Sequence, residues 1–132
     1  MFQVGEVSRS LGINPQTLYF YERIGLIPSP RRTEAGYRLF SQGDVERLAF
    51  ISRAKSLGLS LDEIKEILVL KEGQLLTCKA VYDRLSPKVQ EIQENIQKLQ
   101  TLHDELLPLL EQCRTNFDQA DPKHQCIVLE KD

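Results

Sequence analysis

Three cysteines, Cys78, Cys113 and Cys126, are the side chains of this chain best suited to chemistry. An odd number of cysteines without a dense framework is not typical of a disulfide scaffold, so we expect free thiols or metal ligands. Thiolates bind soft and borderline metal ions, and a thiol pair on a loop is also oxidisable. The cysteines therefore indicate a metal site or, as the alternative, a redox-sensitive pair formed by Cys113 and Cys126.

Two of these cysteines flank a long predicted helix over residues 79–112. Its apolar residues follow one another in steps of three and four, apart from one step of seven that His103 fills, which is typical of a coiled-coil seam. They are Tyr82, Leu85, Val89, Ile92, Ile96, Leu99, Leu106 and Leu110. The rest of so short a chain cannot cover a helix this long with so narrow an apolar stripe. We therefore expect a second copy of the chain to cover it, which makes the protein a homodimer.

The direction of this helix pairing decides which thiols meet. At about 1.5 Å per residue, Cys78 and Cys113 lie roughly 40–50 Å apart within one chain and cannot share a ligand there. Antiparallel pairing centred on Asn95 and Ile96 would bring Cys78 of one subunit beside Cys113 of the other. Parallel pairing would place each cysteine against its own copy. The periodicity alone leaves both arrangements open.

The charge of the chain is unevenly distributed. Its net charge is −2, but residues 1–59 hold eight Lys/Arg against five Asp/Glu, or +3, and residues 60–132 hold nine against fourteen, or −5. A basic front and an acidic rear are typical of a protein that contacts nucleic acid with one end only. We find no apolar run near 18 residues and no secretory leader, so we expect no membrane association and a cytoplasmic protein.

The basic front contains a predicted helix-turn-helix. Val4 to Leu11 has one apolar face and is followed by Gly12, which ends the first helix. Asn14-Pro15 supplies a cap and a first-turn proline for a second helix over residues 16–23. In a helix-turn-helix this second helix lies in the major groove of DNA.

A small wing and two further helices are predicted next. Residues 31–40 alternate around the turn Glu34-Ala35-Gly36 and predict two strands that carry arginines and a tyrosine suited to phosphate contact. Ser41 and Ser60 are helix caps, so we expect helices over residues 42–57 and from residue 61 onward. We expect Pro87 and Pro108 to kink or bound the long helix. Residues 114–123 predict a loop, and an apolar tail follows it.

The order and sequence of these elements closely resemble the MerR family of bacterial transcription regulators. The resemblance rests on Phe20-Tyr21-Glu22, Gly36-Tyr37-Arg38 and the run from Leu57 to Ile64, and it covers the whole chain. It implies an all-α fold with a small β wing: a winged helix-turn-helix followed by a long antiparallel coiled-coil dimerisation helix. The implied parts are a DNA-binding domain with connecting helices (1–70), a linker (71–78), the dimerisation helix (79–112) and a metal-binding loop with the C-terminal tail (113–132).

The resemblance also implies how the protein acts. Such dimers bind a dyad in double-stranded promoter DNA whose two polymerase elements are spaced too far apart. When the effector binds, the dimer distorts the DNA and RNA polymerase is affected indirectly, which is a form of indirect readout. The matching DNA-contact positions are Gln16, Thr17, Tyr19, Tyr21, Arg32, Tyr37 and Arg38. Tyr19 is a departure, because many members carry arginine there.

The cysteines match the metal-responsive branch of this family. Cys113 and Cys126 match the loop pair and Cys78 matches the thiol that the other subunit donates, whereas sensors of monovalent ions usually have serine at the position of Cys78. A third thiolate suits a divalent soft or borderline ion, so the resemblance implies Hg(II), Pb(II), Cd(II) or Zn(II) as effector. His124, two residues before Cys126, is a candidate fourth ligand.

Other classes of function fit the sequence less well. The chain has two histidines and no glycine-rich phosphate loop, and no nucleophile stands beside a base, so we expect no enzyme activity. Two alternatives keep the same fold. One is a regulator that responds to thiol oxidation, and the other is a sensor of a non-metal effector.

Overall fold

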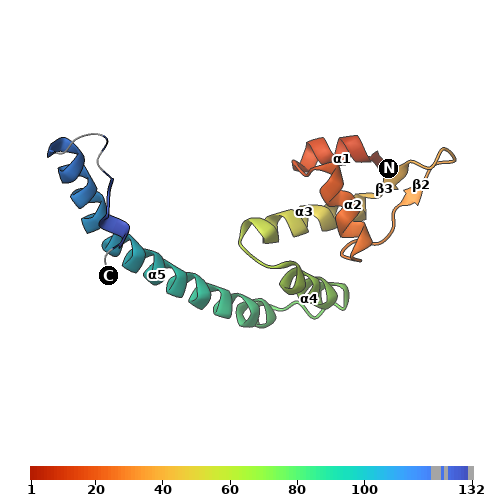
Figure 1. Ribbon diagram of the computed structural model, residues 1–132. Helices are drawn as coiled ribbons and strands as arrows, with labels where there is room; N and C mark the ends of the chain where they lie inside the picture. The colour runs from red at the N-terminus through yellow and green to blue at the C-terminus, as the bar shows by residue number, and fades with distance from the viewer. Residues whose placement is uncertain (120–122, 124, 131–132) are drawn as a thin grey trace. The chain divides into compact units, whose positions relative to one another are not determined.

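The computed structural model of the protein describes residues 1–119, 123 and 125–130. These residues form two compact units, Met1–Tyr82 and Asp83–Asp132, each of which is described by itself. The chain is mostly helical, with one small sheet in the first unit and a long helix that enters the second (Figure 1). The predicted fold class, a mostly helical protein with a small β wing and a long C-terminal helix, is confirmed.

The first unit opens with the predicted helix pair, α1 (Val4–Leu11) and α2 (Pro15–Arg23). Helix α1 ends at Gly12, whose φ of 66° lies in the left-handed region that favours glycine. Helix α2 begins where the Asn14 side chain accepts a hydrogen bond from the backbone N–H of Gln16 at 2.8 Å. Both helix boundaries therefore follow from local residue chemistry.

The wing consists of β2 (Arg31–Arg32) and β3 (Arg38–Phe40), which pair antiparallel across a turn in which Gly36 has a φ of 90°. A third strand, β1 (Phe2–Gln3), pairs with the other edge of β3 and gives the order β1-β3-β2. The two-strand prediction was incomplete. A strand of two residues is too short to show the alternation from which strands are recognised.

Helices α3 (Gln42–Ser56) and α4 (Leu61–Glu72) complete the core of the first unit. Each begins with a capping box, formed by Ser41 with Asp44 and by Ser60 with Glu63. Helix α3 packs against α1, β3 and α4. The side chains below 2% exposure in this core are Val7, Leu18, Leu26, Phe40, Leu48, Ile51 and Ile64.

The long helix α5 (Cys78–Gln119) runs for 42 residues and contains both Pro87 and Pro108. It begins one residue before the predicted start, so the link after α4 is shorter than the predicted 71–78. It also passes the predicted end at Gln112, so residues 114–119 are helical rather than the predicted loop. The apolar period stops near Cys113, but the residues that follow contain no glycine or proline, and the backbone continues as a largely polar helix.

Most of the predicted seam is exposed in the single chain, with Val89 at 54%, Ile96 at 59% and Leu110 at 68%. After α5, a short 3-10 helix, η1 (Val128–Glu130), buries Val128 to 4% exposure within the second unit. Among the described residues, no helix is both long and apolar enough to cross a lipid bilayer.

Leu48 offers a direct test of the core. Its side chain is fully buried, so Leu48→Ala is expected to lower the free energy of unfolding by about 2–5 kcal/mol through lost transfer energy and a cavity. Leu57→Ala, at a leucine that is half exposed just after the same helix, should cost only about 0.5 kcal/mol. Urea unfolding at one fixed protein concentration measures both variants, and equal losses would contradict this assignment of the core.

Candidate nucleic-acid interface and metal centre

The second helix of the helix-turn-helix presents most of its predicted DNA contacts outward. Gln16 and Tyr19 are exposed and Thr17 is half-buried. Tyr21 differs, because its ring packs in the core at 7% exposure, and this burial raises the pKa of its phenol. The exposed groups of α2 can therefore donate hydrogen bonds to a groove or to phosphate, whereas Tyr21 offers little surface.

The wing adds cations and a phenol to the same unit. Tyr37 is 70% exposed, and Arg32 Nη1 donates to the carbonyl oxygen of Gly36 at 2.9 Å, which ties the arginine to its own turn. Arg38, on β3, is partly buried. A hollow of about 230 Å³ separates the start of α1 from α2 and the wing; it is lined by Gln3, Val4, Gly5, Tyr19, Gly36, Tyr37 and Arg38.

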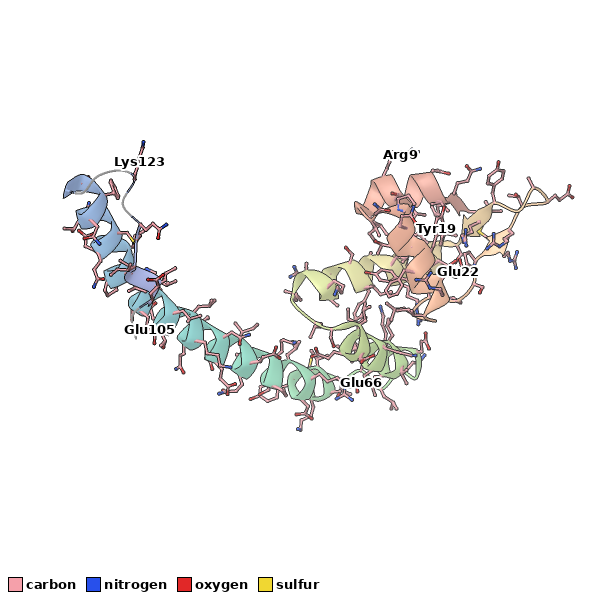
Figure 2. All side chains as sticks on the ribbon, in the orientation of Figure 1. Arg9, Tyr19, Glu22, Glu66, Glu105 and Lys123 are labelled. Carbon is pink, nitrogen blue, oxygen red and sulfur yellow. The ribbon has the colours of Figure 1, made fainter. Side chains whose placement is uncertain are left out.

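One acidic residue joins α2 to the wing. Glu22 Oε1 accepts a hydrogen bond from Arg38 Nε at 2.6 Å, and Glu22 Oε2 lies 3.9 Å from Arg32 Nη2. The guanidinium carbon of Arg38 also lies 4.3 Å from the centre of the Tyr19 ring. Figure 2 labels Tyr19 and Glu22 on α2. Sequence reasoning missed Glu22, although its spacing of three residues from Tyr19 places both on one helix face.

The structure brings two of the three cysteines together. Cys113, half-buried on α5, has its Sγ 3.6 Å from Sγ of Cys126, which lies in the tail before η1. The hydrogen bond with Cys126 raises the pKa of the Cys113 thiol, with smaller contributions from desolvation and from the charge of Cys126. The Cys113 thiol therefore loses its proton less readily than an ordinary cysteine does.

The separation of the two sulfurs fits a chelating pair of thiolates. Two Zn–S bonds of about 2.3 Å at a tetrahedral angle place their sulfur atoms about 3.8 Å apart. A linear ion bound with similar bond lengths would need about 4.6 Å. The observed 3.6 Å is a thiol–thiol contact close to these values, so both sulfur atoms are near enough to bind one ion, and the donor set suits a soft or borderline metal ion.

The two remaining predicted ligands are Cys78 and His124. Cys78 is exposed as the first residue of α5 and belongs to the first unit. His124 lies outside the described residues. Within residues 1–119, 123 and 125–130, no three His, Cys, Asp or Glu side chains are grouped so as to hold a metal ion.

Comparison with known families gives two matches that together span most of the chain. Residues 2–70 match the family described as MerR HTH family regulatory protein. Residues 45–109 match the family described as MerR, DNA binding.

Individual relatives match over nearly the full length. The chain is 41% identical to an uncharacterized HTH-type transcriptional regulator, slr0701, of Synechocystis (98% of this chain, 94% of the relative). It is 39% identical to the mercuric resistance operon regulatory protein of Bacillus cereus (98% and 95%). Among solved structures, the transcription regulator PbrR691 from Ralstonia metallidurans in complex with lead(II) is 30% identical, with a TM-score of 0.80 and 98% of each chain covered.

The raised pKa of Cys113 can be tested by alkylation of the metal-free protein. Cys126→Ala removes its largest cause, so the pH profile of Cys113 alkylation should shift to lower pH, with a rate at neutral pH about threefold higher per unit of pKa. Iodoacetamide labelling of the Cys113 peptide, followed by mass spectrometry, measures this.

Cys126→Ser is the control, since it keeps a polar group but no thiolate. A profile that rises in rate without moving along the pH axis would mean that the substitution changed only the exposure of Cys113.

Proposed function

The chain belongs to the MerR family of helix-turn-helix regulatory proteins, and on this premise we propose that it is a metal-responsive regulator that binds promoter DNA as a homodimer. Members of this family are transcription regulators rather than enzymes. The observation that carries the metal part of the proposal is the Cys113–Cys126 pair, with its sulfur atoms 3.6 Å apart.

In the proposed complex, α2 contacts the DNA bases and the wing contacts the DNA backbone. Gln16, Thr17 and Tyr19 reach base edges or nearby phosphates from α2, and Tyr21 contributes at most its hydroxyl. Arg32, Tyr37 and Arg38 bind phosphates from the wing, where guanidinium groups suit bidentate contacts. These contacts would hold a duplex firmly enough for the protein to deform it.

The dimer is proposed from the exposed seam of α5. Most of its apolar side chains are exposed among the described residues, and burying them against a partner would be favourable. A second α5 packed against it as an antiparallel coiled coil would bury the stripe. It would also bring Cys78 of one subunit to the Cys113–Cys126 pair of the other.

Three thiolates would then form the effector site. Cys113 and Cys126 supply two, and Cys78 of a second copy supplies the third. Cys78 is joined to α4 only through residues 73–77, so a bond at its sulfur acts directly on the segment that links the DNA-binding unit to α5. A bound ion would crosslink these sulfur atoms, and residues 73–77 would transmit the resulting constraint to α4 and the DNA-binding unit.

The donor set favours a divalent soft ion. Three thiolates without a fourth ligand suit Hg(II) or Pb(II), whereas Zn(II) prefers four ligands in a closed tetrahedron. The mercuric resistance regulator and the lead(II)-bound regulator among the relatives support this range of metals, which also includes Cd(II) and Zn(II). RNA polymerase would respond through the altered promoter rather than through a contact with the metal site.

A thiol redox switch is the second candidate, and the same sulfur pair favours it. A peroxide could accept two electrons from Cys113 and Cys126; an S–S bond would form, and the peroxide with the two thiol protons would leave as water or as an alcohol and water. A disulfide would use only these two thiols, whereas a metal site would also use the third thiol, Cys78, so metal binding is the favoured function.

The variant Cys78→Ser distinguishes the two candidates. We expect the response of a promoter fusion to metal to fall about tenfold or more, because one of three ligands is lost, while binding to operator DNA stays within about twofold. The exposed Gln93→Ser on the same helix is the control and should respond normally. Full metal induction in Cys78→Ser would contradict the three-thiolate site, and a peroxide response that survives in this variant would favour the disulfide switch.

Metal competition tests the choice of ion. Hg(II) or Pb(II) should activate the fusion at lower concentration than Zn(II), and His124→Ala should weaken only the Zn(II) response, since that ion needs a fourth ligand. Zn(II) acting most strongly and depending on His124 would instead assign a tetrahedral site.

A further inference from the structure

Glu22 is an acidic residue placed in the middle of a surface proposed to bind phosphate. Its carboxylate lies between two arginines of the wing: one oxygen accepts from Arg38 Nε at 2.6 Å, and the other is 3.9 Å from Arg32 Nη2. The Glu22 side chain is 17% exposed, so the contact is partly shielded from water. A negative charge here repels phosphate, which raises the question of what it contributes.

Tyr19 lies one helical turn before Glu22 and holds the same arginine from another direction. The Arg38 guanidinium lies over the Tyr19 ring, 4.3 Å from its centre, a distance at which cations are attracted to aromatic faces. Glu22 thus fixes the edge of the guanidinium and Tyr19 fixes its face. Both anchors come from α2, whereas Arg38 belongs to β3, so the contacts join the two parts of the DNA-binding unit.

Arg38 donates to Glu22 through Nε, and this choice of atom decides which of its other N–H groups can bind phosphate. A guanidinium carries five N–H donors, and the one at Nε is the donor that Glu22 takes. The two terminal nitrogens keep their hydrogens for other acceptors, and they form the fork that matches a phosphate. A side chain fixed through Nε loses less rotamer entropy when it binds phosphate than a free arginine does.

We infer that Glu22 is a positioning residue that, together with Tyr19, holds the Arg38 guanidinium ready to bind a DNA phosphate and locks the wing to α2. This inference rests on the proposed DNA-binding function and adds a residue that the contact surface itself does not include. It implies that the negative charge of Glu22 weakens phosphate attraction less than the orientation of Arg38 strengthens it.

The sign of the effect separates positioning from simple charge. If only charge matters, removing Glu22 should tighten DNA binding and steepen its salt dependence, because the surface gains one net positive charge. If Glu22 positions Arg38, Glu22→Ala should weaken binding about tenfold and lower the salt slope by about one, since one phosphate contact is lost. Glu22→Gln keeps an acceptor for Arg38 Nε and should fall between wild type and Glu22→Ala.

The experiment measures binding of the full chain to a mixed-sequence duplex, long enough for both halves of a dimer, over a series of salt concentrations. Glu34→Ala is the matched control, because Glu34 is an exposed acid on the wing turn and removing it changes the charge alone. In an Arg38→Ala background, Glu22→Ala should cause little or no further loss, whereas a purely structural role would persist there. Thermal unfolding of each variant checks that the fold is intact.

Each outcome decides a separate claim. Wild-type protein that fails to bind the duplex at low salt would overturn the proposed function itself. Wild-type binding with Glu22→Ala equal to or tighter than wild type, as for Glu34→Ala, would overturn the positioning role and leave DNA binding in place. A Glu22→Ala loss that survives in the Arg38→Ala background would also overturn it. If Glu22→Ala does not fold, Glu22→Gln decides by the same comparison.

Discussion

The exposed apolar stripe of α5 is the constraint on which the rest of the protein depends. Most of the stability of a helix in a protein comes from packing of its apolar face, and the single chain leaves that face of the 42-residue α5 more than half exposed at Val89, Ile96 and Leu110. Covering it with a second chain would fix the separation of two DNA-binding units and the position of the thiols together. Dimerisation, sensing and DNA spacing would then depend on the same side chains.

Local chemistry made much of the first unit predictable. The caps at Asn14, Ser41 and Ser60 and the glycine that ends α1 mark boundaries by hydrogen bonding or by backbone conformation, and the structure places helix ends there. Strand β1 was missed because its two residues are held by pairing with β3, a contact distant in sequence. The continuation of α5 to Gln119 was missed because a polar helix end carries no apolar period.

The candidate site was predictable in its residue types but not in its contacts. The spacing of the cysteines could not reveal that the tail places Cys126 at 3.6 Å from Cys113, because that depends on how the tail packs. Nor could composition reveal that the Glu22 carboxylate accepts a hydrogen bond from Arg38. The wing therefore presents fewer free charges than its arginines suggest, and its affinity for DNA depends on geometry as much as on net charge.

The burial of Val128 has a consequence for the chelating pair. This side chain, only 4% exposed, ties the end of the tail down close to Cys126. An ion already bound to Cys113 would therefore find the Cys126 sulfur at a higher effective concentration than if Cys126 were on a freely moving chain end. The entropy of closing the chelate ring would then be lost during folding rather than during metal binding, which would strengthen the metal binding proposed for this pair.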